Sequence, residues 1–325
     1  MKRIQLSNTE FEGNNNVYLL DTEDEVGLID TGVYNRPTID EFEQGLSQHG
    51  LSPGDIDHVF LTHWHADHVG LAGFVQERSG ASVYVHEEDA PLVRQDDEAW
   101  EEMSEKQERL FNEWGMPEEK RERLLNFFEG SAPLRGEPPM VETFVEGDTF
   151  GLGGVTLEVL HVPGHTAGLS CFLVDGINEE NEAFVGDSLL PVYTPNVGGA
   201  DVRVEKPLKK YLNTLHRIAD LDLDRVWPGH RYPILDPTER AHEIIDHHWE
   251  RSSRVVDVLE RHGPSDAWTV SAHLFGELEN IHILHGPGEA YAHLEHLSDN
   301  GIVKSVSGGY TTSSNASEKL AELMF

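Results

Sequence analysis

The fold of this chain is decided by the stretch Thr62-His63-Trp64-His65-Ala66-Asp67-His68, which directly follows an apolar run at residues 59–61. Imidazole and carboxylate groups are the ligands that a divalent ion such as zinc prefers. The spacing of His63 and His65 puts both rings on one side of an extended segment, so they can share one ion. Asp67 and His68 open an apolar-periodic stretch that predicts a helix to about Gly80, so they point elsewhere and suit a second ion.

The same stretch has a simpler interpretation, in which a strand-to-helix loop carries histidines that only cap the helix and contact water. That interpretation would be preferred for one pair of histidines. The complete pattern His-x-His-x-Asp-His after a buried strand favours a metal site instead.

Further segments, in chain order, match the motifs that accompany such a stretch in one known family. An opening strand pair is indicated by Asn15-Asn16-Val17-Tyr18-Leu19-Leu20 and Leu28-Ile29-Asp30-Thr31-Gly32. Later in the chain come Pro163-Gly164-His165-Thr166, Gly186-Asp187 and Pro228-Gly229-His230. With these motifs as a set, the sequence resembles the metallo-β-lactamase superfamily over residues 1 to about 235, although Gly-His or Gly-Asp alone would carry no weight.

The resemblance implies a dinuclear metal site. The seven positions at which the family binds its metals are all filled, by His63, His65, Asp67, His68, His165, Asp187 and His230. The histidines at 63, 65 and 165 would hold one ion, and Asp67, His68 and His230 the other, with Asp187 between them. The implied cofactors are two divalent metal ions, with zinc expected and iron or manganese as alternatives. Asp67 and Asp187 are the expected catalytic carboxylates.

Apolar patterns along the chain alternate between strands and helices, which indicates an α/β protein. The expected architecture is an αβ/βα sandwich of the metallo-β-lactamase type, with a catalytic domain at 1–235, a helical insertion at about 87–140 and a small winged-helix-like domain at 236–325. Further strands and helices are expected at residues 15–31, 37–49, 57–61, 82–86, 143–149, 155–161, 170–174, 183–187, 207–219 and 225–230.

The insertion at 87–140 carries 16 acidic and 7 basic residues, with aromatic residues at helical spacing. Apolar residues in such a pattern predict mainly packing onto the domain. A lid over the metal site is the alternative, because insertions of this kind shape substrate pockets in related hydrolases. In that case Trp100, Phe111 or Trp114 would line the pocket.

The C-terminal region predicts three helices and a hairpin at 302–312, a set similar to a winged helix. Winged helices suggest nucleic acid, but residues 240–325 hold 13 acidic and 6 basic residues, and phosphate binding depends on Lys and Arg. Nucleic acid is therefore not expected as a partner. We expect a tail that supports the fold, forms a homodimer or helps to close the site.

The chain of 325 residues carries 59 acidic and 24 basic residues, a net charge of −35. Such an excess destabilises the compact state by self-repulsion unless salt screens it. Because the acidic residues are spread along the chain, the salt-adapted cytosol of a halophile is the simplest explanation, and a surface for a basic partner is the alternative.

The single cysteine, Cys171, excludes an intramolecular disulfide and lies in an apolar segment that predicts a buried strand. The N-terminal residues lack the apolar segment of a signal peptide, and no stretch approaches 18 uninterrupted apolar residues. We therefore expect a soluble, cytoplasmic protein with no membrane association.

Four other polar residues are of interest because of their positions in the chain. Asp30 ends a predicted strand, where it either orients a metal ligand, as in the family, or forms a turn. His161 lies inside a strand close to His165 and is expected to be structural. Tyr193 and Asn196, in a segment rich in Pro, Gly and Asn, are candidates for substrate contact.

The expected chemistry is hydrolysis by a hydroxide that two metal ions generate from water at neutral pH. The resemblance to the hydroxyacylglutathione-hydrolase-related group implies a small-molecule acyl substrate, namely a thioester, ester or lactone. One alternative is a phosphodiesterase or endoribonuclease, which the winged-helix-like tail supports and its charge opposes. Another is a mono-iron persulfide dioxygenase. A metal-containing binding protein is the third, and the complete ligand set argues against it.

Overall fold

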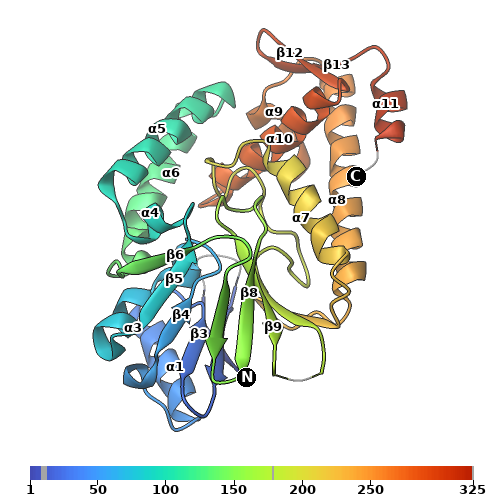
Figure 1. Cartoon of the computed structure of the whole chain (residues 1–325). Coiled ribbons are helices and arrows are strands. Elements are labelled where there is room, and N and C mark those ends of the chain that lie inside the picture. Colours follow the sequence, from blue (N-terminus) through green and yellow to red (C-terminus); the bar gives the residue numbers. More distant parts are fainter. Residues whose placement is uncertain (9–12, 178, 324–325) are drawn as a thin grey trace.

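The computed structural model describes residues 1–8, 13–177 and 179–323, and two packed β-sheets form its centre (Figure 1). The first sheet runs in chain order through β1 (Lys2–Leu6), β2 (Asn15–Asp21), β3 (Val26–Ile29), β4 (His58–Phe60), β5 (Ser82–His86) and β6 (Val141–Phe144). The second sheet has the order β11 (Arg225–Pro228), β10 (Glu182–Gly186), β9 (Ser170–Asp175), β8 (Val155–His161) and β7 (Thr149–Leu152). Strands β3 to β6 pair in parallel, as do β10 and β11.

Aromatic side chains fill the space between the two sheets. Phe60 of β4 lies edge-on to Phe172 of β9, with ring centroids 5.8 Å apart, and Phe144 of β6 lies 5.5 Å from the same ring. Full burial of each such side chain contributes about 1.5–3 kcal/mol, and edge-to-face geometry adds to this. The interlocked rings fix the position of the strands from which the polar loops emerge.

Helices cover the outer faces of both sheets. Helices α1 (Arg36–Ser47), α2 (Ala66–Val69) and α3 (Ala72–Ser79) pack on the first sheet, near the 3₁₀ turn η1 (Pro53–Asp55). Helices α7 (Pro207–Ala219) and α8 (Pro237–His262) pack on the second sheet. This order of helix, sheet, sheet and helix confirms the predicted αβ/βα sandwich.

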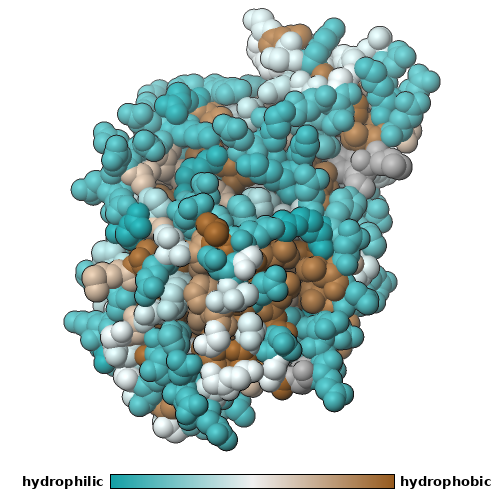
Figure 2. Space-filling view, in the orientation of Figure 1, coloured by the Kyte–Doolittle hydropathy of each residue, from teal (hydrophilic) through white to brown (hydrophobic). Residues whose placement is uncertain are grey.

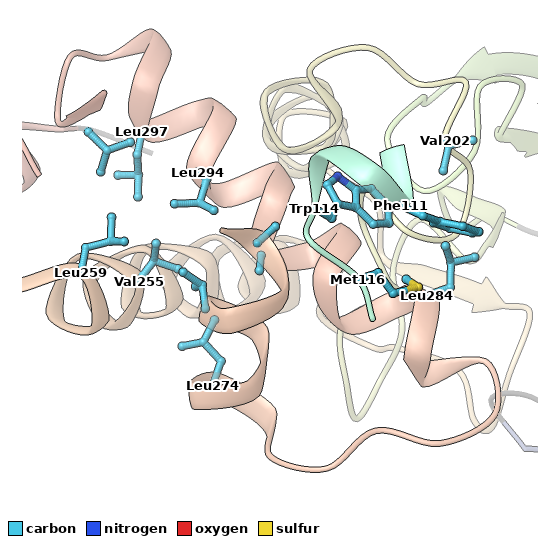
Figure 3. Packing of buried hydrophobic residues seen from close by; sticks show 14 of the residues in the cluster. Phe111, Trp114, Met116, Val202, Val255, Leu259, Leu274, Leu284, Leu294 and Leu297 are labelled. Carbon is cyan, nitrogen blue, oxygen red and sulfur yellow. The ribbon is translucent and has the colours of Figure 1, made fainter. Parts of the chain in front are cut away.

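The helical insertion and the C-terminal region share one hydrophobic core. The insertion consists of α4 (Ala90–Val93), α5 (Asp97–Glu113), α6 (Glu118–Ser131) and the 3₁₀ turn η2 (Ala132–Arg135). The C-terminal region adds α9 (Ala267–Phe275), α10 (His282–Asp299), the hairpin of β12 (Val303–Val306) and β13 (Gly309–Thr312), and α11 (Ala316–Glu322). Figure 3 shows Phe111, Trp114 and Met116 packed beside the residues of α8 to α10. The two regions therefore depend on each other for burial.

Three details of the sequence prediction were wrong or incomplete. The helix expected from Asp67 to about Gly80 is two helices, α2 and α3, because the backbone leaves helical geometry at Leu71 (φ −93°, ψ 2°). The strand expected at 143–149 is two strands, separated by a turn at Gly147 (φ 86°), and they belong to different sheets. Strand β1 was missed because only two apolar residues mark it.

Hydrophilic side chains cover most of the visible face of the molecule (Figure 2). Within the described residues, no helix combines the length and the apolar character that crossing a bilayer requires.

We expect the melting temperature to rise with KCl concentration, because the Debye length falls from about 30 Å at 0.01 M to about 3 Å at 1 M and screens the repulsion among 59 acidic residues. Thermal denaturation in a KCl series, with a matched sucrose series as the control for excluded-solute effects, measures this. A melting temperature that is insensitive to KCl would remove the halophile interpretation.

Candidate metal centre

The predicted ligands all lie in loops at the ends of strands. His63 and His65 follow β4, and Asp67 and His68 lie in the short helix α2 that comes next. His165 lies between β8 and β9. Asp187 follows β10 and His230 follows β11. The structure brings all seven together, in overlapping groups of three, across the end of the sandwich. Rigid strands thus hold ligands that are up to 167 positions apart in the chain.

Three histidine nitrogens converge in the first group. Nε2 of His63 lies 3.0 Å from Nδ1 of His65, which lies 3.1 Å from Nε2 of His165. Burial, reinforced by the neighbouring histidines, lowers the pKa of His63 well below its usual value and that of His65 to about 3. The rings are therefore neutral, and each can point a lone pair at the same spot.

Two carboxylates and two histidines make up the second group. Oδ2 of Asp67 lies 3.8 Å from Nε2 of His68 and 3.5 Å from Nε2 of His230. Asp187 lies between both groups, because its oxygens are 3.6 Å from Nε2 of His68, 3.4 Å from Nε2 of His230 and 3.9 Å from Nε2 of His165. This is the place that a bridging carboxylate would occupy.

Several polar atoms at the centre of the cluster are buried without a hydrogen-bond partner among the described residues, namely His68 Nε2, His230 Nε2 and Asp187 Oδ1. Such atoms cost about 1–3 kcal/mol each unless something satisfies them. Burial opposes charge on His68, but Asp187, Asp30 and Asp67 still raise its pKa well above the usual value. Positive charge is thus favoured here, and two divalent ions would supply it. The residues present fit a dinuclear site.

The nitrogen of each histidine that points away from the cluster is held by a neighbouring acceptor, which fixes the ring and leaves the other nitrogen free for a metal. The pairs are His63 Nδ1 with Thr62 Oγ1 (3.0 Å), His65 Nε2 with Ala200 O (3.1 Å), His68 Nδ1 with Asp30 Oδ2 (2.8 Å), His165 Nδ1 with Asn196 O (2.8 Å) and His230 Nδ1 with Gly13 O (3.2 Å).

Asp30 orients a ligand, as its position after β3 allowed. Its carboxylate accepts hydrogen bonds from Nδ1 of His68 and from both the backbone N and the Oγ1 of Thr62, at 2.8 Å each. Asp30 also has a positive φ of 59°. Its contacts therefore support the first interpretation, in which it orients a predicted ligand. His161, which was expected to be structural, donates to Ala167 O at 2.7 Å.

A buried ion network that the sequence did not predict braces the two histidine loops. Arg203 Nη2 lies 2.6 Å from both Asp89 and Asp201. Asp89 accepts from the backbone N of Trp64 and from Thr166 Oγ1, while Asp201 accepts from Trp64 Nε1. The network therefore joins the loop of His63 and His65 to that of His165. No motif marks it, because its members meet only in the folded chain.

The loop at 196–200 connects the metal site to helix α10. Its carbonyl groups hold His65 and His165, and the side chain of Asn196 shapes it by accepting from the backbone N of Gly199 and Ala200. Asn196 Nδ2 donates to Glu289 Oε2 at 2.9 Å. A Cβ on Gly288 would lie 2.4 Å from the Cα of Gly199, so the loop and the helix meet backbone to backbone. Asn196 thus has a structural role in addition to lining the cavity.

Glu289 also belongs to a second buried group, with His248 and His293. Arg251 forms a close ion pair with the Glu289 carboxylate and already neutralises it. Burial lowers the pKa of both histidines, to about 4 for His293. This group is therefore a compensated polar cluster within α8 and α10, without the excess negative charge that the metal site has.

A cavity of about 1760 Å³ opens beside the ligands. It is lined by His65, Asp67, His165 and Asp187, and by apolar side chains of the metal loop, the insertion and the C-terminal region, among them Trp64, Trp100, Phe111, Leu125, Phe128, Phe275 and Leu284. The insertion therefore shapes the cavity, as expected for Trp100 and Phe111. Trp114 does not line it, because its ring is fully buried against α9 and α10. Tyr193 lines the cavity and bonds to Arg231.

Residues 11–230 match the family model of the metallo-beta-lactamase superfamily. The chain belongs to this superfamily. It is similar to a metallo-beta-lactamase family protein of Thermus thermophilus, at 31% identity and a TM-score of 0.83 over 96% of this chain and 98% of that one. That likeness includes the C-terminal helices.

Two curated relatives from eukaryotes are more distant. The "Beta-lactamase-like protein 2 homolog" of Caenorhabditis elegans is 26% identical over 81% of this chain and 71% of its own length. "Thioesterase pkgB" of Emericella nidulans is 26% identical over 77% of this chain, and the match spans only 55% of that relative. The chain thus belongs to the metallo-β-lactamase superfamily, and its relatives include a protein named as a thioesterase.

Proposed function

We propose that this protein is a dinuclear metal-dependent hydrolase of a small acyl compound, a thioester, ester or lactone. One observation carries the proposal: seven candidate ligands, all buried except the partly buried His65, lie in adjoining groups, and four of them line a cavity that also has aromatic and aliphatic walls. A concave site of this kind takes a small molecule. The thioesterase named among the relatives supports the choice of acyl chemistry.

His63, His65 and His165 would hold one ion and Asp67, His68 and His230 the other, with Asp187 contacting both. When bound, two divalent ions lower the pKa of a water and polarise a carbonyl group. Asp67 lies in the cavity wall, where its carboxylate can accept a proton from the attacking water. Asn15 Nδ2 donates to one oxygen of Asp67 at 3.2 Å and keeps it oriented.

A phosphodiester substrate fits this cavity poorly. Several carboxylates lie in its walls, on α5 and α6, at Glu101, Glu105, Glu108, Glu118, Glu122 and Glu129. They repel a phosphate backbone, and molar salt would weaken any remaining counterion-release binding. The winged-helix-like arrangement of α8 to α10 and the hairpin is therefore proposed to support the site and not to bind nucleic acid.

We expect turnover of thioesters or lactones, and no cleavage of RNA, when the zinc-, iron- and manganese-loaded proteins are assayed in molar KCl. The His63→Ala variant serves as the control for contaminating enzymes. Cleavage of single-stranded RNA that is lost in this variant, with thioesters and lactones untouched, would favour the nuclease alternative. Full activity at one iron per chain, with a persulfide as the substrate, would favour the dioxygenase alternative.

A further inference from the structure

We propose that the substrate carries a carboxylate on its acyl chain and that Arg135 binds it. This inference rests on the proposed function and names the class of acyl group. Three observations support it together. Arg135 lines the cavity and has no acidic partner in the part of the chain that the structure describes. Aromatic rings lead from it to the predicted ligand His65, and its backbone packs on α2, the helix of Asp67 and His68.

Arg135 differs from the other arginines of the cavity. Arg121 donates to the carbonyls of Met116 and Phe111, Arg231 bonds to Tyr193, and Arg251 pairs with Glu289. The guanidinium of Arg135 forms no ion pair with a carboxylate of the described residues, although the chain holds 59 acidic residues. Burial lowers its pKa from the usual value. Because a guanidinium matches a carboxylate in geometry and charge, such a partly buried arginine can bind an anion from outside the protein.

Aromatic side chains lead from this guanidinium to the metal site. Cζ of Arg135 lies 3.7 Å above the ring of Trp100. That ring is 5.5 Å from Trp64, and Trp64 is 4.6 Å from the ring of the ligand His65, measured between centroids. All four residues line the cavity. An acyl chain could thus lie along the tryptophans, with its carbonyl at the metals and its far end at Arg135.

The position of Arg135 is fixed by backbone contacts. The turn η2, which ends at Arg135, lies directly on α2, the helix of Asp67 and His68. Leu134 O accepts from Tyr34 N at 2.8 Å, and a Cβ on Gly136 would lie 2.2 Å from Gly70 O. Gln95 Nε2 also donates to Gly136 O at 2.9 Å. These contacts hold the backbone of Arg135 against α2, and stacking on Trp100 positions its guanidinium, as a length-selective anchor requires.

The surroundings of Arg135 also limit the charge of the ligand. The glutamates elsewhere in the cavity walls disfavour a group with several negative charges, such as a polyphosphate. A single carboxylate pairs with one guanidinium in a bidentate geometry and adds only one charge. This favours an ω-carboxyacyl group over a nucleotide-bearing one.

The test compares N-acetylcysteamine thioesters in pairs of equal chain length, each pair having one neutral acyl group and one ending in a carboxylate: hexanoyl with adipoyl, and octanoyl with suberyl. We expect one length to give the highest kcat/KM for the carboxylated member. In Arg135→Gln the ratio of carboxylated to neutral kcat/KM should fall by roughly 10- to 100-fold through KM, because the charged hydrogen bonds are lost. Arg135→Lys should restore part of it.

Arg123→Gln is the matched control, since it removes the same charge from an exposed position on α6 whose partner is Glu279. In this control the ratio of carboxylated to neutral kcat/KM should equal that of the parent protein. Melting temperatures check that each variant is folded. If the ratio of carboxylated to neutral kcat/KM is unchanged in Arg135→Gln while the parent hydrolyses these thioesters, the assignment of Arg135 is wrong and the proposed function stands. Failure of the metal-loaded parent to hydrolyse either member of any pair, or any lactone, would overturn the proposed function.

Discussion

Asp187→Ala is expected to lower turnover by at least about 100-fold and to reduce metal content from two ions per chain to one or fewer. The Asp187 carboxylate lies within 4 Å of His68, His165 and His230, so it contacts both ligand groups. Replacing a residue that only orients a metal ligand already lowers metal affinity or activity by about 10- to 100-fold. Replacing a residue shared by two ions should lower them by at least as much. Without it, two cations would repel each other across a buried site.

Elemental analysis of the purified protein and a hydrolysis assay on the same sample measure this effect. Asp175→Ala, an exposed position at the end of β9, is the control for the loss of one acidic residue from the same sheet. Near-normal turnover and two retained ions in Asp187→Ala would show that the bridging assignment is wrong.

Glu289→Ala is expected to cost about 3–5 kcal/mol of folding stability, although Glu289 is not a proposed ligand. The substitution leaves Arg251 as an uncompensated buried charge, which is what makes removal of one partner of a buried pair costly. It also removes one of the two acceptors of Asn196 Nδ2, the other being His285 O, and the acceptor of the backbone N of Val197. The loop whose carbonyls hold His65 and His165 should then loosen, and metal affinity should fall by roughly 10-fold or more.

Urea denaturation of the metal-free protein separates the loss of stability from the loss of metal affinity, which zinc titration measures. Glu295→Ala is the matched control, because it removes a half-buried carboxylate from the same helix. Burial and the like charge of Asp299 raise the pKa of Glu295. A variant at Glu289 with the stability and zinc affinity of the parent would contradict the role of this contact.

The sequence predicted the parts of the site that depend on local order. A ligand at the end of each apolar strand could be recognised because residue type and strand pattern lie next to each other in the chain, as for Asp187 after β10. The packing of the sandwich followed from the same alternation of strands and helices, and all seven predicted ligands meet as expected.

The parts that the sequence did not predict depend on contacts between distant segments. Asp89 precedes Ala90-Pro91 and resembles an ordinary residue at a helix start, while its partner Arg203 lies 114 positions away. Likewise Trp114 has the helical spacing of a cavity residue, and only the packing of α9 and α10 shows that its ring is buried elsewhere. Spacing shows which face of a helix is apolar, but not what covers that face.

The contact between Gly199 and Gly288 has a consequence for the order in which the protein matures during synthesis. All seven ligands have left the ribosome once residue 230 has emerged, but the helix that supports the loop of Asn196 ends only at Asp299. A nascent chain that stops short of this helix would bear a full ligand set on an unsupported loop. High-affinity loading with metal should therefore wait until α10 has emerged, and chains that stop before this helix should be poor competitors for zinc.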